Sequence, residues 1–324
     1  MRGPLAPTVV ALGNVAPKLV EEHLPADVRF VPDPGPDDLA RAVGAIVRAD
    51  PHVDAALLDR MPHLRVIART GVGVDRVDLD EASRRGIAVV VTPGTGTHAV
   101  AEGTLAMVLH LVKQLRWSTA CVAEGRWEHR DERTLGDLEG SVIGIVGYGR
   151  IGRRVGDLAR AFGMTVLAHD PFAQPGPEMV DLDELRRRSQ VITLHLPLTD
   201  STRHLVDDTF LRKVLPGTVL VNCGRGGLLD LDAAQTALDD GRLSGLGLDV
   251  FDPEPPPHHP VFDHDNVVLS PHLMGLSASA TRATFAAAAR GITDVLEGRV
   301  PAAVVNAGMH HASPPVASAM KESL

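Results

Sequence analysis

A glycine-rich turn near the middle of the chain is the feature that most constrains its fold. The segment Gly147–Gly152 matches the pattern G-x-G-x-x-G, follows the apolar run Val142–Val146 and opens the helical run Arg150–Phe162. In such a unit the first glycine permits a tight turn, the second lets a pyrophosphate approach the backbone, and the third lets the helix pack on the strand. This context predicts a dinucleotide site. Its predicted contacts in the turn are Gly147, Tyr148, Gly149, Arg150, Ile151 and Gly152.

Asp170 indicates which dinucleotide binds. It follows the next predicted strand, Met164–Ala168, where this kind of unit carries an acidic residue. A carboxylate there accepts hydrogen bonds from a ribose hydroxyl and repels a 2′-phosphate, so we predict NAD rather than NADP. Cys223 and Asp249, close to the ends of two later predicted strands, complete the predicted cofactor contacts. We interpret Cys223 as a packing residue and not as a nucleophile.

Strand-like and helical runs alternate on both sides of the turn. This alternation is typical of parallel sheets covered by helices, and 324 residues suit two such domains. With 44% hydrophobic but only 3% aromatic residues, the cores must consist of Ala, Val, Leu and Ile. We therefore predict two doubly wound parallel-sheet domains of the α/β class. The other predicted strands are Thr8–Leu12, Val28–Val31, Ala45–Arg48, Arg65–Arg69, Ile87–Val91, Val191–Leu196, Thr218–Asn222, Gly245–Val250 and Val267–Leu269.

Two long helical runs mark the predicted domain boundaries. His98–Leu115 is apolar on more than one face, which predicts one buried helix, covered in part by a second subunit. Ser279–Leu296 is rich in alanine and follows the second sheet, so we predict that it crosses back to the first domain. The predicted substrate domain comprises residues 1–97 plus 277–308, and the NAD-binding domain comprises residues 98–276. Residues 309–324 have the composition of a disordered tail.

Three residues with complementary chemistry follow the glycine-rich turn. His272 lies after a predicted strand, and a histidine that titrates near neutral pH can both take and return the proton of a substrate hydroxyl. Glu254 can bond the other ring nitrogen, which fixes the tautomer and raises the histidine pKa. Arg225 can hold a carboxylate and polarise the adjacent carbonyl. Together with the turn, these three candidate catalytic residues predict hydride transfer on a 2-hydroxy acid.

Charge and composition exclude several other classes of protein. The formal net charge of −9 gives nucleic acid and anionic membranes no general electrostatic attraction. No apolar signal segment and no run of ~18 apolar residues is present. The two cysteines suggest no disulfide framework, so we expect a cytoplasmic protein without a membrane or nucleic-acid partner. The pair His258–His259 has no standard ligand spacing, and we predict no metal.

These motifs resemble those of a known family. Over about residues 8–306 the chain is similar to the D-isomer-specific 2-hydroxyacid dehydrogenases. Residues 69–78 and 84–87 look most like the phosphoglycerate dehydrogenases of that family, in a short form without a regulatory domain, so we expect no serine-type feedback site. The family's carboxylate-binding arginine, histidine-orienting glutamate, acid–base histidine and NAD-selecting aspartate match Arg225, Glu254, His272 and Asp170.

The resemblance also implies an architecture and a substrate site. It implies a Rossmann NAD domain inserted in a flavodoxin-like substrate domain, a cleft between them, and a homodimer built around the long helix. It places the substrate carboxylate on the backbone N–H groups of Val72, Gly73 and Val74, and such groups in a glycine-relaxed loop suit an anion. Arg48 and Arg69 match arginines that contact the substrate phosphate, which predicts a second anionic group.

Three positions depart from the phosphoglycerate dehydrogenase pattern. Ala49 stands where a serine is usual, Gly96 where an asparagine is usual, and Met274 where a small glycine is usual. These changes remove polar contacts and add an apolar wall to the expected substrate pocket. They therefore put phosphoglycerate in doubt as the substrate, while the hydride chemistry is unaffected.

The predicted function is an NAD-dependent oxidoreductase that interconverts a small D-2-hydroxy acid, such as 3-phosphoglycerate, with its 2-keto acid. Reduction of hydroxypyruvate or glyoxylate and oxidation of a phosphonate- or sulfonate-type hydroxy acid stay open as alternatives. In a different class, an NAD(H)-sensing, corepressor-like binding protein also stays open. Formate oxidation is disfavoured because that relative pairs its histidine with glutamine, and NADPH-linked reduction is disfavoured by Asp170.

Overall fold

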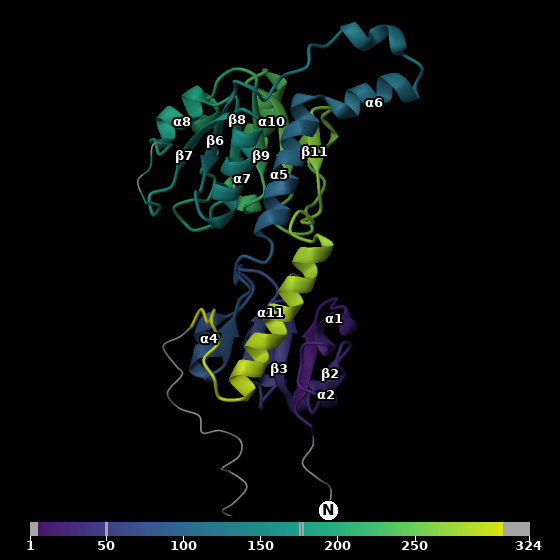
Figure 1. Ribbon diagram of the computed structural model, residues 1–324, viewed down its shortest axis with the longest axis vertical. Helices are drawn as coiled ribbons and strands as arrows, with labels where there is room; N and C mark the ends of the chain where they lie inside the picture. The colour runs from purple at the N-terminus through teal and green to yellow at the C-terminus, as the bar shows by residue number, and fades with distance from the viewer. Residues whose placement is uncertain (1–5, 49–50, 175, 177, 307–324) are drawn as a thin grey trace, which may run out of the picture. The chain divides into compact units, whose positions relative to one another are not determined.

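The computed structural model describes residues 6–48, 51–174, 176 and 178–306. The described residues form two compact units. Unit 1 runs to Gly96 and resumes at Ala278, and unit 2 comprises Thr97–Ser277 (Figure 1). The tail predicted for residues 309–324 lies outside the described residues.

Unit 1 contains a five-stranded parallel sheet. Its strands are β1 (Thr8–Leu12), β2 (Arg29–Val31), β3 (Ala42–Val47), β4 (Val66–Arg69) and β5 (Ala88–Val90). They pair in the parallel order β2-β1-β3-β4-β5. This is the flavodoxin-like order, in which successive strands are added first on one side of β1 and then, from β3 on, on its other side. The predicted flavodoxin-like class of this domain is therefore confirmed.

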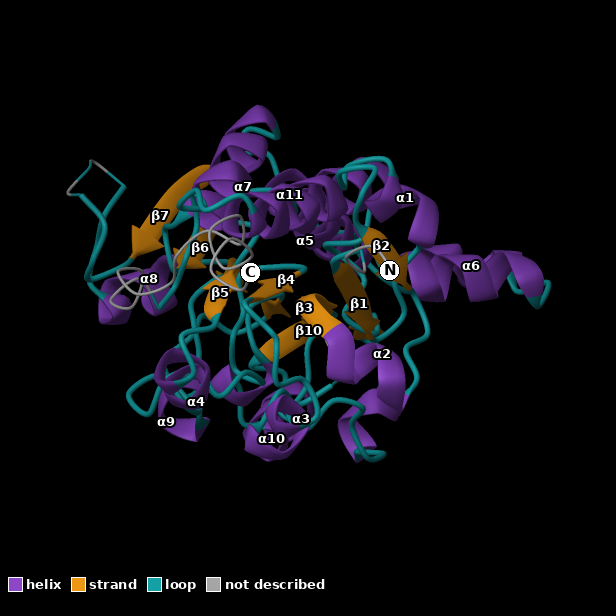
Figure 2. Cartoon of the chain, turned by 90° about the horizontal axis from the view of Figure 1, so that it is seen from below, coloured by secondary structure: helices purple, strands orange, loops and turns teal. Residues whose placement is uncertain are grey.

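Helices cover both faces of this sheet (Figure 2). The side chains of β1 alternate between two cores: Val9 and Ala11 face one, and Val10 and Leu12 face the other. One face is covered by α1 (Pro17–Glu21) and α11 (Ala278–Leu296), and the other by α2 (Pro36–Arg41), α3 (Ala55–Asp59) and α4 (Leu79–Arg84). Helix α11 lies close to the sheet because Gly291 faces Val90, where a Cβ would come within 2.7 Å of the valine side chain.

The last described residues protect the edge of this sheet. The Val91 N–H donates to the Ala303 carbonyl (3.0 Å), and the Val305 N–H donates to the Val89 carbonyl (2.9 Å). The Asn306 side chain accepts from the Val89 N–H and donates to the Ile87 carbonyl, both at 2.9 Å. Residues 303–306 therefore pair with β5 in place of another strand, which keeps its backbone groups from pairing elsewhere.

Unit 2 contains a six-stranded parallel sheet. Its strands are β6 (Val142–Val146), β7 (Thr165–His169), β8 (Val191–Leu194), β9 (Thr218–Asn222), β10 (Leu243–Leu248) and β11 (Val267–Leu269). They pair in the order β11-β10-β9-β8-β6-β7, so the order reverses between β6 and β8. Ligands of open α/β sheets bind outside the carboxyl ends of the strands at such a switch point, and β6 ends at the glycine-rich turn.

Helices pack on both faces of this second sheet (Figure 2). Helices α5 (Thr97–Val112) and α7 (Arg150–Ala161) cover one face. Helices α8 (Leu182–Arg188), α9 (Asp208–Leu211) and α10 (Leu231–Asp239) cover the other. The remaining elements are α6 (Leu115–Ala123) and the short 3-10 helices η1 (Trp127–Asp131), η2 (Gly226–Leu228) and η3 (Pro260–Asp263).

The prediction of one helix over His98–Leu115 was wrong at its end. Helix α5 stops at Val112, Gln114 adopts a left-handed conformation (φ 46°), and α6 then continues to Ala123. The break is held by tertiary contacts: the Lys113 ammonium donates to the Gly136 carbonyl (2.6 Å), and the Gln114 side chain donates to the Thr134 carbonyl (3.1 Å). Lysine and glutamine both favour helices, so the sequence carries no local stop signal here.

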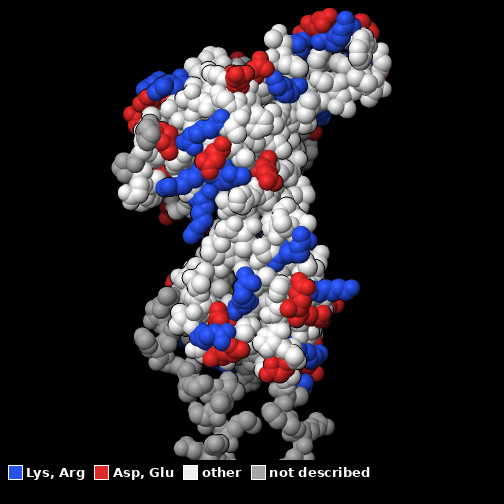
Figure 3. Space-filling model, in the orientation of Figure 1, with Lys and Arg blue, Asp and Glu red and all other residues white. Residues whose placement is uncertain are grey.

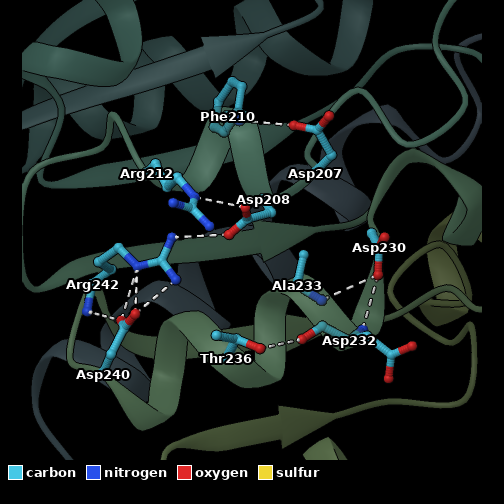
Figure 4. A network of polar contacts seen from close by, with 10 residues as sticks. All are labelled: Asp207, Asp208, Phe210, Arg212, Asp230, Asp232, Ala233, Thr236, Asp240 and Arg242. Carbon is cyan, nitrogen blue, oxygen red and sulfur yellow. Dashed lines mark hydrogen bonds and ion pairs between the residues drawn. The ribbon is translucent and has the colours of Figure 1, made fainter.

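Aspartates cap the N-termini of most short helices. Asp54, Asp78, Asp181, Asp207 and Asp230 cap α3, α4, α8, α9 and α10, each by accepting backbone N–H groups of the first turn. Figure 4 shows the caps of α9 and α10 within one polar network. Helix α7 begins differently: its N-cap is Gly149, which has no side chain to accept these N–H groups.

The described surface is mixed in charge. Lys and Arg side chains are interspersed with Asp and Glu over the face drawn in Figure 3. None of the helices in the described ranges is long and apolar enough to cross a membrane.

Candidate active site

The three glycines of the turn have different surroundings. Gly147 has a φ of +91°, and a Cβ there would lie 2.6 Å from the His195 carbonyl group. A Cβ at Gly152 would overlap the Gly147 carbonyl oxygen. A Cβ at Gly149 would meet nothing within 4 Å. Packing therefore requires the first and third glycines, whereas the second borders open space.

The N-terminus of α7 fits a dinucleotide pyrophosphate. Because no side chain caps it, the N–H groups of its first turn can point to a bound anion, and the helix dipole favours negative charge there. Arg150 and Ile151 are the first two residues of this turn. Arg153, one turn along, donates through Nε to the Tyr148 carbonyl (3.0 Å), which fixes the turn from the helix side.

Asp170 lies at the end of β7, beside the glycine-rich turn. One carboxylate oxygen accepts the Tyr148 N–H (2.9 Å) and the other accepts the Phe172 N–H (2.9 Å). Each oxygen keeps a second lone pair, so the carboxylate can still accept from a ribose hydroxyl. Tyr148 offers only backbone to a cofactor because its side chain is buried and its hydroxyl accepts from Arg160 (3.1 Å).

Cys223 is a packing residue, as the sequence suggested. Its side chain is buried in the core beneath α5. Burial, more than the nearby Asp249 charge, raises the pKa of the Cys223 thiol to about 12. The thiol therefore stays protonated at neutral pH and is not a nucleophile.

Glu254 and His272 form a hydrogen-bonded pair. His272 Nδ1 lies 2.9 Å from one Glu254 oxygen and 3.2 Å from the other. The Phe251 N–H also donates to Glu254 (3.0 Å), which holds the carboxylate in place. The His272 side chain is 46% exposed, so its second ring nitrogen, Nε2, is available to a substrate.

The pair shifts both pKa values in the direction that keeps it charged. The bond to Glu254 raises the pKa of His272 above its ordinary value, against the effects of burial and of the Arg225 charge. Burial favours the neutral form of Glu254, but the bonds from His272 and from the Phe251 N–H outweigh it, and the pKa of Glu254 falls. His272 therefore keeps its proton to higher pH than an isolated histidine.

Asp249 supports the loop that carries His272, a role that sequence reasoning missed. Its side chain is buried, and its carboxylate accepts the N–H groups of Leu273 (2.8 Å) and Met274 (3.3 Å). Its carbonyl accepts the His272 N–H (2.8 Å). These bonds stabilise the left-handed conformation of His272 (φ 54°), which is unusual for a residue other than glycine. Only the position of Asp249 at a strand end could have indicated this.

Met274 packs inside unit 2. It is partly buried and packs against the core between α5 and the sheet, and a Cβ at Gly103 of α5 would overlap its side chain. Whether Met274 also adds an apolar wall to the substrate pocket stays a prediction. Glycine at position 103 and methionine at position 274 together seat the His272 loop on α5.

Arg225 follows β9 in a turn that is fixed by its neighbours. Its Nη1 donates to the Gly224 carbonyl (2.8 Å), and the Asn222 side chain donates to the Arg225 carbonyl (2.9 Å). A Cβ at Gly226 would overlap the Phe251 backbone. The glycine next to Arg225 therefore lets this turn pack on the segment that leads to Glu254, and the Arg225 charge is felt by both Glu254 and His272.

Unit 1 carries the other candidate residues. Arg48 is half-buried and donates to the Asn14 carbonyl (3.0 Å). Arg69 is buried and donates to backbone carbonyls of its own unit. The N–H groups of Val72, Gly73 and Val74 donate to no acceptor within the described part of the chain. Ala49 lies outside the described residues.

The histidines near η3 pair with carboxylates. His258 lies 3.1 Å from Asp263, and His259 lies 3.2 Å from Asp232. Both contacts are two-residue pairs at the surface, with side-chain oxygens that are exposed to solvent. They are consistent with ordinary surface ion pairs.

Known proteins resemble this chain in sequence and in fold. Residues 105–274 match the model of the D-isomer-specific 2-hydroxyacid dehydrogenase family, NAD-binding domain. The D-3-phosphoglycerate dehydrogenase of Mycobacterium tuberculosis is 37% identical over 315 residues, which cover 94% of this chain and 58% of that protein. The glyoxylate reductase of Thermofilum pendens is 37% identical over 265 residues, 78% of each chain. The crystal structure of the TT0316 protein from Thermus thermophilus has a TM-score of 0.86 at 35% identity and covers 92% of this chain and 99% of that one.

The fold and the site thus define a two-unit α/β protein with a glycine-rich dinucleotide turn and a hydrogen-bonded histidine–glutamate pair. The chain belongs to the D-isomer-specific 2-hydroxyacid dehydrogenase family, and the resemblance predicted from its motifs is confirmed. Residues 105–274 are an NAD-binding domain of that family, which also confirms NAD as the predicted cofactor. The chain spans somewhat more than half of the length of the mycobacterial relative.

Replacing Glu254 with glutamine tests the electrostatic coupling of the pair. The amide keeps the shape of the side chain but loses its charge, so the protonated form of His272 loses its main stabilisation and the pKa of His272 falls. We expect a nuclear magnetic resonance titration of the His272 ring to have its midpoint at lower pH in the E254Q variant than in the wild type. An unchanged midpoint would show that Glu254 does not set this pKa. The variant D263N, beside His258, serves as a matched control and should leave His272 unchanged.

Proposed function

We propose that the protein is an NAD-dependent dehydrogenase of small D-2-hydroxy acids. The observation that carries this proposal is the Glu254–His272 pair, held at 2.9 Å in the same unit as the NAD turn. An acid–base histidine with a raised pKa is what the interconversion of an alcohol and a ketone requires. The roles of the individual residues in binding and catalysis belong to the same proposal.

Each side chain has a distinct task in this reaction. When bound, NAD supplies the nicotinamide carbon that accepts or donates the hydride. His272 Nε2 takes the hydroxyl proton during oxidation and returns a proton to the carbonyl oxygen during reduction. Glu254 keeps Nδ1 protonated, which leaves Nε2 as the nitrogen that exchanges the proton. Arg225 binds the substrate carboxylate and polarises the neighbouring carbonyl.

The cofactor would be held by unit 2. The first turn of α7 would bind the pyrophosphate through the N–H groups that follow Gly149. Asp170 would accept from a ribose hydroxyl and disfavour a 2′-phosphate. Asp249 would contribute by holding the His272 loop, as its hydrogen bonds indicate.

The substrate is a small acid that carries a second anionic group, such as 3-phosphoglycerate. The mycobacterial relative is named for that substrate, and Arg48 provides a cation in unit 1. Reduction of glyoxylate or hydroxypyruvate is the second candidate, since a relative of the same identity is named glyoxylate reductase. A phosphonate-type hydroxy acid would suit Arg48 equally well, because a guanidinium pairs with any such anion.

NADH consumption with a panel of keto acids separates these candidates. The panel comprises 3-phosphohydroxypyruvate, hydroxypyruvate, glyoxylate, pyruvate, 2-oxoglutarate and a phosphono analogue, with NADPH as the cofactor control. We expect the highest kcat/KM with NADH and a doubly anionic keto acid. Preference for glyoxylate or hydroxypyruvate would favour the second candidate. Tight NADH binding without turnover of any acid would contradict the proposed enzyme and favour an NAD(H)-sensing protein.

The variant His272→Ala tests the acid–base role. We expect turnover to fall by about 10²- to 10⁴-fold, because the variant lacks the proposed acid–base group, while the Kd for NADH stays near the wild-type value. The matched control is His258→Ala, which removes another exposed histidine that is paired with a carboxylate in the same unit. Turnover of the His272→Ala variant at a rate close to the wild type would overturn the mechanism.

We further propose that the protein is a homodimer that associates through the arm formed by residues 115–135. In Figure 1 this arm, which includes α6 and η1, extends away from the sheet of unit 2. It exposes large apolar side chains: Val122 is 65% exposed and Trp127 is 64% exposed. Exposed apolar surface of this kind is typical of contacts between subunits.

Sedimentation velocity tests the dimer. We expect the wild type to sediment as a dimer at micromolar concentration, and the variant Val122→Asp/Trp127→Asp to sediment as a monomer, because two buried charges would oppose association. The control Phe162→Asp changes an exposed apolar residue of unit 2 outside the arm and should remain dimeric. A monomeric wild type, or a dimeric arm variant, would contradict the proposed interface.

A further inference from the structure

The loop that follows β4 is anchored by its carbonyl groups. Gly71, in a conformation that favours glycine (φ +144°), accepts the Thr92 N–H on its carbonyl (3.0 Å). The Gly71 N–H donates to the Thr92 hydroxyl (2.8 Å). Thr92 is only 2% exposed, so this side of the loop faces the interior of unit 1.

Arg69 makes a second set of bonds to carbonyl groups. Its Nε donates to the Gly73 carbonyl (3.0 Å), and its Nη1 donates to the carbonyls of Arg48 (2.6 Å) and Val47 (3.3 Å). The side chain is buried, at 8% exposure. The guanidinium therefore joins the end of β3 to the loop after β4. Its Nε–H group bonds to the loop, and its Nη1 group bonds to the strand end.

These bonds determine where the neighbouring N–H groups point. In a planar trans peptide the carbonyl and the following N–H point in opposite directions. Because the carbonyls of Gly71 and Gly73 point inward to Thr92 and Arg69, the N–H groups of Val72 and Val74 point outward. Neither N–H donates to an acceptor within the described residues, and the Val72 side chain is 56% exposed.

We infer that Arg69 is a positioning residue that builds a carboxylate-binding site from the N–H groups of Val72 and Val74. This inference rests on the proposed function and on the family resemblance, which implies that this loop receives the substrate carboxylate. It reassigns Arg69, which the sequence pattern predicted to contact a substrate phosphate. Recognition of a second anionic group from unit 1 then falls to Arg48, whose side chain is half-buried and donates to the Asn14 carbonyl.

The conservative variant Arg69→Lys distinguishes the two roles. Lysine keeps the charge, but one ammonium group cannot replace a fork that reaches both strand end and loop. If Arg69 orients the loop, KM rises by about 10- to 100-fold, and by the same factor for hydroxypyruvate and for 3-phosphohydroxypyruvate. A rise of this size is expected when hydrogen bonds to a charged group are weakened. The kcat and the Kd for NADH stay near wild type, because the histidine pair and the NAD turn belong to unit 2.

A phosphate-binding Arg69 would behave differently. KM would then rise for 3-phosphohydroxypyruvate alone, and that outcome overturns the inference, as do unchanged KM values for both acids. The variant Arg48→Met provides the contrast, because it should raise KM selectively for the phosphorylated acid. The matched control is Arg65→Lys, since Arg65 also donates to a unit 1 carbonyl, that of Val295 (3.1 Å), away from the loop. It should leave both KM values unchanged.

A second variant covers the case in which Arg69→Lys does not fold. Thr92→Val removes the acceptor of the Gly71 N–H but keeps the Thr92 backbone bond, so we expect a smaller rise in KM, again equal for the two acids. A selective rise, or none, would contradict the inference. Failure of the proposed function is recognised separately: the wild-type protein would then turn over none of the acids, whatever the effect of these variants.

Discussion

The hydrogen bond between Glu254 and His272 Nδ1 is the interaction on which the proposed chemistry depends. It engages Nδ1, so that Nε2 is the nitrogen proposed to exchange a proton, and it raises the pKa of His272. The bond exists because hydrogen bonds hold the two loops that carry these residues, each of which follows a strand of the unit 2 sheet. Asp249 fixes the His272 loop through three backbone N–H groups, and the Phe251 N–H fixes Glu254. The proposed catalytic pair therefore depends on neighbouring residues that orient its two side chains.

Backbone groups form much of the predicted binding surface in both units. In unit 2 the first turn of α7 begins without a side-chain cap, although five other helices begin with a capping aspartate. In unit 1 the loop after β4 turns its carbonyls inward to Thr92 and Arg69. Both arrangements present N–H groups to an anion, one suited to a pyrophosphate and the other to a carboxylate. Glycine is needed at Gly147 and Gly152, where a Cβ would overlap neighbouring backbone, and at Gly71, whose φ of +144° favours glycine.

Much of this structure follows from patterns that act locally. Alternating strands and helices predicted the two parallel sheets, and the spacing from Gly152 to Asp170 predicted an NAD unit. Residue chemistry predicted that Glu254 would meet His272. Features that depend on distant contacts were missed. Nothing in the local sequence reveals that Lys113 and Gln114 end α5 by bonding to residues 134–136, or that Met274 packs on Gly103. The inward orientation of Arg69 depends likewise on the end of a neighbouring strand.

The fate of the hydride tests the central claim most directly. NADH that carries deuterium at both hydrogen positions of the reactive nicotinamide carbon would be incubated with the preferred keto acid, and the product would be analysed by mass spectrometry and chiral chromatography. The proposed chemistry predicts one deuterium at C2 of the product and the D configuration, with no exchange into solvent, because the hydride passes directly while His272 supplies only the proton. A product without deuterium, or one of the L configuration, would contradict this assignment.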